Sequence, residues 1–462
     1  MPGLLALLLL CAVQFMDALD LSVVGIALPA IQHNFSLSEG TLQWVVSAYV
    51  LGYGGFLLLG GRTADIVGRR RMLIISVGVF LAITVAIVAA PNAGTLLTLR
   101  FLKGVAAGFS APAALALITS LWPEGHARSR ALGIFGATNA IGYCVGVVVG
   151  GLLTAIDWRL VFVVPLPVAI FILLAAPMVL PRDRRDNGPR RQLDIPGAAV
   201  STVGLSALVY AVTVGPEAGW TASRTVLFFA LAAIALLAFP LVERRQTSPL
   251  LDLSLLRGHL VRSGNITGFT LNGAYVAFQF LVTLYLQESL GWSPFATALA
   301  FLPPGIILAV VAPLAGRMNH RIGTPRLLVF GLVTLTAAYA LFTRIGPDSH
   351  YMTALLPTMV LIGVAAGVLF TTANIAGVSG VPEKDLGAAG GLFATSFQVG
   401  GAIVLALTTA VVAAHHGAGH DAAQLVNSYR QGAIFIAVLV ALCCLYAFGE
   451  AVMIRRRRTS MR

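Results

Sequence analysis

The sequence predicts an all-α integral membrane protein with fourteen transmembrane helices, arranged as two six-helix bundles and one additional helix pair. Three observations lead to this prediction. Hydrophobic residues make up 58% of the 462 residues, charged residues only 10%, and the mean hydropathy is +0.89, which is far from the range of soluble proteins. Apolar runs long enough to cross a bilayer recur along the whole chain. A polar loop in the first half also has a weaker copy in the second.

Apolar runs of about 17 to 25 residues mark the individual spans. The first run lacks the basic segment that precedes a cleaved signal and continues past two aspartates, so we expect it to be retained as a helix. The eighth run ends at Pro240, before charged residues 243–245. The predicted spans are 8–31, 42–61, 72–90, 96–121, 131–155, 158–180, 195–214, 224–242, 264–287, 295–316, 327–344, 352–377, 389–413 and 431–454.

Arginine and lysine gather in alternate loops, as the positive-inside rule requires, which places both termini in the cytoplasm of a multi-pass protein of the cell membrane. The two longest cytoplasmic connections flank the seventh and eighth spans. We therefore expect an N-terminal six-helix bundle at 1–181, two additional helices with their linkers at 182–262, and a C-terminal bundle with a basic cytoplasmic tail at 263–462.

The net charge of +12 does not indicate a nucleic-acid partner, because the arginines form short clusters between apolar segments without interleaved aromatic residues. The four cysteines lie inside apolar runs and have no metal-ligand spacing. The residues His415, His416, His420 and Asp421 are too loosely spaced to predict a metal site. We expect neither a metal nor a disulfide.

The loop at 61–71, with the sequence GRTADIVGRRR, joins the second and third spans. Gly61 and Gly68 let the chain turn, while Arg62, Arg69 and Arg70 hold the loop at an anionic cytoplasmic surface. Asp65 is then free to meet a helix N-terminus or an arginine. The sequence GRMNHRIGTPR at 316–326 repeats the interval between the two glycines, which indicates two related halves.

The loop at 61–71 resembles the signature loop of major facilitator superfamily transporters. Other segments resemble the fourteen-helix drug/proton antiporters within that superfamily: LDLSVVGIALP at 19–29, WVVSAY at 44–49, WR at 158–159 and GG at 400–401. Gly25 stands where that family usually has asparagine. The resemblance implies the major facilitator fold, with a substrate site near the bilayer midplane between the bundles, and a proton gradient in place of any cofactor.

The fourth span carries Arg100 and Lys103 before Gly104, which is similar to a family motif whose arginine is implicated in proton transfer. That role is carried over to Arg100, and Lys103 replaces a glutamine of the motif.

The fifth span resembles the glycine motif of exporters, although Val147 stands where the family has proline. Its glycines indicate either plain helix packing or a bias towards an exporting conformation. They are Gly142, Gly146, Gly150 and Gly151.

Asp17 and Asp20 lie three residues apart on the first span, hence on one helix face, with Gln14 one turn earlier. A carboxylate at mid-bilayer costs about 2.5 to 3.5 kcal/mol, so each must be paired, protonated or exposed to a water-filled cavity. Arg100 and Lys103 bring the formal charge of the group to zero. The four side chains either neutralise one another and fix helix packing, or form a proton-coupling site whose protonation breaks an ion pair.

Polar and aromatic residues on several spans are candidates for a substrate cavity, and each of the polar ones can instead make a hydrogen bond between helices. The group has amides and aromatic rings but few charges, which suits a bulky and largely apolar organic molecule. The candidates are Gln14, Tyr49, Tyr53, Asn139, Asn272, Tyr275, Phe278, Gln279, Asn374 and Gln398.

These observations predict a proton-coupled antiporter, acting as a monomer, that exports amphipathic drugs, dyes or natural products by alternating access. Two alternatives stay open. One is a dedicated exporter of a single anionic or neutral metabolite, for which Lys103 beside Arg100 is the motive. The other is an integral-membrane transferase, although the sequence shows no nucleotide-binding glycine loop, metal-ligand cluster or nucleophile motif. We therefore do not expect an enzyme.

Overall fold

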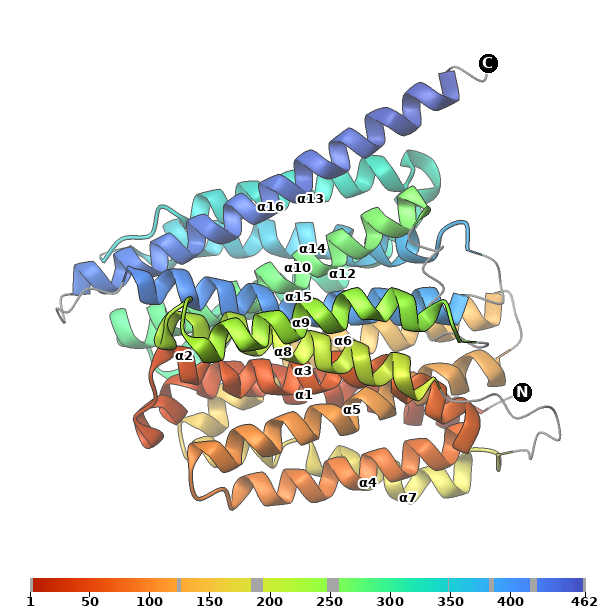
Figure 1. Ribbon diagram of the computed structural model, residues 1–462. Coiled ribbons are helices and arrows are strands. Elements are labelled where there is room, and N and C mark those ends of the chain that lie inside the picture. Colours follow the sequence, from red (N-terminus) through yellow and green to blue (C-terminus); the bar gives the residue numbers. More distant parts are fainter. Residues whose placement is uncertain are drawn as a thin grey trace. The chain divides into compact units, whose positions relative to one another are not determined.

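The computed structural model describes residues 3–122, 126–183, 194–246, 257–347, 349–381, 386–415 and 422–459 (Figure 1). Every regular element in these ranges is a helix, as the composition predicts. The chain divides into two compact units. Unit 1 comprises 1–211, 221–251 and 293–299, and unit 2 comprises 212–220, 252–292 and 300–462.

Unit 1 contains the helices of the N-terminal half together with most of the α8 and α9 pair and the short α11. Their bounds are α1 Leu4–Phe35, α2 Glu39–Leu42, α3 Trp44–Val67, α4 Arg69–Val88, α5 Ala93–Leu121, α6 His126–Thr154, η1 Trp158–Phe162, α7 Leu166–Val179, α8 Ile195–Ala218, α9 Ser223–Glu243 and α11 Pro294–Ala300.

Unit 2 contains the helices of the C-terminal half, and its last helix is the longest of the described chain (Figure 1). The bounds are α10 His259–Leu284, η3 Tyr285–Ser289, α12 Leu302–Ile322, α13 Thr324–Phe342, η4 Tyr351–Leu355, α14 Leu356–Val378, α15 Leu386–Ala414 and α16 Ala422–Thr459.

The two units follow one packing scheme. In unit 1, α1 packs against α6, while α3 and α4 both pack against α5. In unit 2, α10 packs against α15, while α12 and α13 both pack against α14. The order of partners along the chain is the same in both units, which agrees with the two related halves that the repeated loop indicates.

The two copies of the loop also adopt the same backbone turn. Gly68 separates α3 from α4 with φ 109° and ψ 130°, and Gly323 separates α12 from α13 with φ 91° and ψ 143°. Residues with a Cβ atom rarely adopt this positive φ, so glycine is needed at both positions. The shared interval between glycines therefore reflects a shared chain reversal.

Close helix contacts in each unit depend on glycine. A Cβ atom at Gly104 of α5 would collide with the Tyr49 backbone of α3, and one at Gly52 would collide with the Phe101 carbonyl. In unit 2, a Cβ atom at Gly400 of α15 would collide with the Phe269 carbonyl of α10. At these places the neighbouring backbones touch directly, which is the usual device for close packing of helices in lipid.

Eleven helices in the described ranges are long and apolar enough to cross a membrane. They include α10, which is the most buried of them, and α9, which is the most exposed. Two shorter apolar stretches lie at 141–154 in α6 and 196–208 in α8. The chain is therefore a multi-pass membrane protein, although these helices do not confirm the count of fourteen spans.

Three predicted spans differ in detail from the helices observed. The stretch 158–180 consists of η1 and α7, with residues 163–165 between them. The stretch 295–316 is not one helix but α11 and α12, which meet at Phe301. Pro303 and Pro304 follow this break, and since proline lacks a backbone donor it favours the first turn of a new helix. The last span, predicted at 431–454, extends in both directions to Ala422–Thr459, because polar residues continue the helix beyond the apolar run.

The contact between α3 and α5 gives a testable prediction. Gly104→Ala places a methyl group against the Tyr49 backbone, which cannot rotate away, so we expect a loss of about 1 to 3 kcal/mol in stability. Gly449→Ala on α16 is the matched control, because a Cβ atom there meets nothing within 4 Å. Thermal unfolding in detergent should show a lower midpoint for the first variant only; equal midpoints would contradict the close contact.

Candidate functional site

A buried ion cluster joins α1 to α5 in unit 1. Arg100 Nη1 donates to Asp20 Oδ2 at 2.8 Å, and Lys103 Nζ donates to Asp20 Oδ1 at 2.5 Å. The three side chains have no exposed surface. Arg100 and Lys103 reach the same carboxylate because they lie three residues apart, on one face of α5. One carboxylate is thus the counter-ion of two cations, and it offsets one of their two positive charges.

Aromatic rings and one backbone carbonyl complete the surroundings of the two cations. Arg100 Nε donates to the Val45 carbonyl of α3 at 2.8 Å, and its guanidinium lies 4.6 Å from the centre of the Tyr49 ring. Lys103 Nζ lies 4.5 Å from the centre of the Phe80 ring of α4. Ring faces carry partial negative charge, so these contacts stabilise the cations where water is excluded.

Asp17 has a different environment from Asp20, although both lie on the same face of α1. Its side chain is only 3% exposed, and neither carboxylate oxygen has a hydrogen-bond partner among the described residues. Asp20 and Lys103 are the charged groups close enough to act on it. The sequence predicts one helix face for the two acids. The structure shows that Asp20 is ion-paired, whereas Asp17 has no hydrogen-bond partner among the described residues.

The glycines of α6 hold α1 beside this cluster. Added Cβ atoms at Gly142, Gly146 and Gly150 would collide with α1 at Phe15, at Leu19 and Ser22, and at Val23, respectively. Gly151 instead faces α11, where a Cβ atom would meet Ala298. Three of the four glycines therefore bring the α6 backbone onto the stretch of α1 that carries Asp17 and Asp20, which is the packing interpretation of the motif.

The loop between α3 and α4 is held by contacts that the sequence did not reveal. Asp183, which follows α7, accepts from the backbone N–H groups of Arg70 and Arg71, both at 3.0 Å. It caps the first turn of α4, and the absence of a side chain at Gly68 makes room for its carboxylate. The side chains of Arg69 and Arg70 donate to the carbonyls of Ala116 and Pro177.

Two predicted residues of this loop, Arg62 and Asp65, have side chains outside the described part of the structure, and Gly61 lies within α3. The predicted partner of Asp65, a helix N-terminus or an arginine, therefore stays a prediction. The acceptor that the structure shows at the start of α4 is Asp183. Spacing in sequence could not indicate this cap, because Asp183 lies 113 residues beyond Arg70.

The cavity candidates of unit 1 lie on three helices. Tyr49 and Tyr53 are buried on α3 with ring centres 6.0 Å apart, and the Tyr49 ring is the one that covers Arg100. Gln14 on α1 and Asn139 on α6 are partly exposed. Tyr49 therefore belongs to the surroundings of the ion cluster.

The cavity candidates of unit 2 have diverse environments. Asn272 Nδ2 donates to the Phe397 carbonyl at 2.8 Å, so this side chain connects α10 to α15 by a hydrogen bond. Phe278 is fully buried and packs edge-on against Phe342, with ring centres 4.8 Å apart.

Two amides have buried atoms without a partner among the described residues: Gln279 through Nε2 and Gln398 through Oε1. Tyr275 is partly exposed and Asn374 is exposed.

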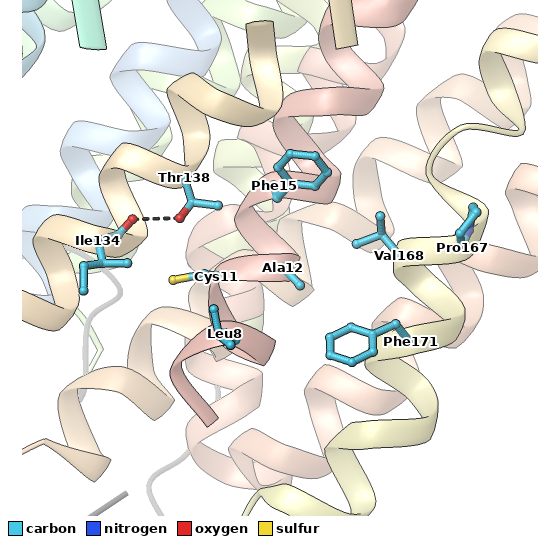
Figure 2. A pocket seen from close by; sticks show the side chains of 9 residues that line it. All are labelled: Leu8, Cys11, Ala12, Phe15, Ile134, Thr138, Pro167, Val168 and Phe171. Carbon is cyan, nitrogen blue, oxygen red and sulfur yellow. Dashed lines mark hydrogen bonds between the residues drawn. The ribbon is translucent and has the colours of Figure 1, made fainter. Parts of the chain in front are cut away.

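A separate pocket of about 440 Å³ lies between α1, α6 and α7 (Figure 2). Phe171 and Val168 of α7 face Ala12 and Phe15 of α1 across it. Its single hydroxyl, that of Thr138, donates to the Ile134 carbonyl at 2.8 Å. The pocket is therefore apolar, and none of the cavity candidates lines it. The lining residues are Leu8, Cys11, Ala12, Phe15, Ile134, Thr138, Pro167, Val168 and Phe171.

No group of three or more metal-ligating side chains occurs among the described residues. His416, His420 and Asp421 of the histidine-containing loop lie outside those residues. His415 is described; it follows the end of α15, and its Nδ1 lies 2.8 Å from the Val411 carbonyl in the last turn of that helix.

The ion cluster predicts an asymmetric response to substitution. Asp20→Asn leaves two buried cations without a counter-ion, so we expect a loss of about 3 to 5 kcal/mol in stability. Lys103→Gln should cost less, because the pair of Asp20 and Arg100 survives. Combining the two substitutions should recover part of the loss, since one unpaired cation is removed. A double-mutant cycle of thermal unfolding measures this, and simple additivity of the two effects would contradict the shared carboxylate.

The cap on α4 gives a second prediction. Asp183→Ala removes the acceptor for two backbone N–H groups, which we expect to destabilise the first turn of α4 by about 0.5 to 2 kcal/mol. Hydrogen exchange followed by mass spectrometry should show faster exchange at Arg70 and Arg71. Asp157→Ala is the matched control, because Asp157 caps η1 by accepting from Arg159 N. Unchanged exchange in α4 would show that the Asp183 contact is not maintained in the membrane.

Comparison with known proteins places this chain in a family. The sequence model of the Major Facilitator Superfamily matches residues 10–405. A puromycin resistance protein from Streptomyces alboniger is 40% identical over 98% of this chain and 91% of its own length. A cephamycin export protein from Amycolatopsis lactamdurans is 33% identical over 94% and 90%. A multidrug resistance protein from Mycobacterium tuberculosis is 33% identical over 87% and 74%.

Solved structures show the same fold at low sequence identity. A peptide transporter crystallised with sulfate has a TM-score of 0.72 and 14% identity, with 98% of this chain and 94% of that chain covered. A bacterial homologue of the lysosomal transporter Spinster has a TM-score of 0.68 and 17% identity, with 96% of both chains covered. The match of the superfamily model over most of the sequence shows that this chain belongs to the major facilitator superfamily, as a small-molecule transporter and not an enzyme.

Proposed function

We propose that this transporter exports amphipathic organic compounds, such as drugs or natural products, from the cytoplasm in exchange for protons. The resistance and export roles named for its relatives support the direction of transport and the kind of substrate. The observation that carries the proton coupling is the buried cluster of Asp20, Arg100 and Lys103 with Asp17 beside it. Ionisable groups inside a membrane are costly, and they commonly mark ion pathways and proton relays.

The proposed topology has fourteen spans with both termini in the cytoplasm. Besides the eleven apolar helices, α3, α6 and α8 contain 24, 29 and 24 residues. At about 1.5 Å per residue, each reaches the roughly 30 Å of a bilayer core. The distribution of arginines supports the orientation. On this scheme α8 and α9 are the additional pair, and the remaining twelve spans form the two six-helix bundles.

In the proposed mechanism, transport depends on which acids of the ion cluster are protonated, because protonation determines which ion pairs can form. A buried ion pair is stable only while both charges are satisfied, so adding or removing one proton changes which contacts are favourable. Alternating access needs such an element with two arrangements, each preferred in one protonation state. Protons entering from outside would load the cluster as substrate leaves, and proton release to the cytoplasm would reset the carrier.

The chemistry of unit 2 suits a substrate with a large apolar body and few polar groups. Gln279 Nε2 offers a hydrogen-bond donor and Gln398 Oε1 an acceptor, and both atoms are buried without a partner in the described chain. Buried polar atoms are normally satisfied, so a ligand group is a reasonable partner for each of them.

The environment of Lys103 argues against the alternative of a dedicated exporter of one anionic metabolite. Its ammonium group donates to Asp20, lies over Phe80 and has no exposed surface, so it is not available to bind an anion. A broad range of unrelated cationic and neutral substrates would favour the drug exporter, whereas transport of one metabolite alone would favour the alternative.

Purified protein in proteoliposomes tests the proposed function directly. With a pH gradient imposed across the vesicle membrane, we expect lipophilic dyes and puromycin to accumulate on the acidic side, with proton movement in the opposite direction. Collapsing the gradient with a protonophore should stop the accumulation. Arg100→Ala vesicles, matched in protein content, serve as the inactive control. Substrate transport that is indifferent to the pH gradient would overturn the proton antiport.

A further inference from the structure

We infer that the transported proton is carried by Asp17, whereas Asp20 remains an ionised carboxylate that fixes the two cations of α5. This inference rests on the proposed proton coupling and assigns its two acids different roles. It depends on which oxygen atoms in the cluster already have partners. The sequence gives the two aspartates the same helix face and so could not assign these roles.

Asp20 is unsuited to carry the proton because of what its neutralisation would leave behind. Both of its oxygens accept from cations, one from Arg100 and one from Lys103. Protonating it would leave two fully buried cations without a counter-ion, which costs far more than the net value of the pair. Asp20 therefore stays charged and acts as a positioning residue that connects α1 to α5.

Asp17 is the acid whose proton can be exchanged without breaking that connection. Both of its oxygens lack partners among the described residues, in a position only 3% exposed. An ionised carboxylate in such a place is very costly, whereas a neutral carboxylic acid carries no charge to be solvated. In this conformation, Asp17 therefore holds the proton. The groups that face it are Asp20 on its own helix, Lys103 from α5 and the Tyr49 phenol from α3.

Loss of the proton from Asp17 creates a second anion in a cluster whose cations still have unused N–H groups. Arg100 Nη2 is buried and has no partner among the described residues. With Asp17 ionised, the formal charge of the four side chains falls from +1 to zero, and the two acids compete for Lys103, which is close to both. That competition shifts the contacts between α1 and α5, so it supplies the two arrangements that alternating access requires.

Asp17→Asn tests this assignment, because it keeps the size of the side chain and removes only the exchangeable proton. In proteoliposomes, we expect the variant to lose substrate-dependent proton flux but retain exchange of labelled for unlabelled substrate, a process that needs no net proton transfer. Asp17→Glu restores a carboxyl group and should restore proton flux. Thermal unfolding should show that Asp17→Asn is folded, since it removes no hydrogen bond.

A second measurement reports on the proton itself. Infrared difference spectra between acid and alkaline pH should contain a protonated carboxyl band in the native protein that disappears in Asp17→Asn. Asp157→Ala, which removes the carboxyl that caps η1 and leaves the ion cluster intact, should retain the band. Proton flux or an unchanged band in folded Asp17→Asn would overturn the assignment while leaving proton antiport intact. An absence of proton coupling in the native protein would overturn the proposed function and this inference with it.

Discussion

The Asp20 carboxylate pairs with two cations at a place where all three side chains are fully buried, and the arrangement of unit 1 is consistent with this constraint. The ion cluster requires α1 and α5 to stay within hydrogen-bond reach. It also requires α3 to supply a carbonyl and a ring to Arg100, and α4 to supply the Phe80 ring to Lys103. Four helices are therefore positioned around one anion, and a shift in any of them exposes an unsatisfied charge.

Backbone contacts through glycine hold the helices of unit 1 close enough for the hydrogen bonds of the ion cluster. On one side, Gly142, Gly146 and Gly150 bring α6 onto α1, and on the other, Gly52 and Gly104 bring α3 onto α5. Direct contact between backbones leaves little freedom for sliding, so short polar contacts can persist in a medium that gives no hydrophobic drive for helix association. Unit 2 uses the same scheme, with Gly400 of α15 against α10, and it also has a shared carboxylate, since Glu450 of α16 contacts both His259 and Arg262 of α10. Those two side chains are 36% and 40% exposed, whereas the ion cluster of unit 1 has no exposed surface.

The sequence predicted the helical class and the related halves because hydropathy and the glycine interval are local signals. It missed the break at Phe301, since the apolar run continues across Pro303 and Pro304. It found all four charged residues of the candidate site, yet it could not tell Asp17 from Asp20, because spacing defines a helix face and not the contacts made from it. Phe80 and Asp183 were missed altogether, since neither has a signal near the residues that it contacts.

The unequal chemistry of the two units has an evolutionary consequence for the proposed exporter. Where unit 1 buries ions, unit 2 buries a cluster of rings in which Phe278 of α10 meets Tyr339 and Phe342 of α13. Aromatic packing tolerates changes of size and shape better than a shared carboxylate tolerates the loss of a partner. On the proposed mechanism, selection for resistance to a new compound can therefore act on the second half of the gene without disturbing the ion cluster of unit 1, so the range of substrates and the proton coupling can change separately.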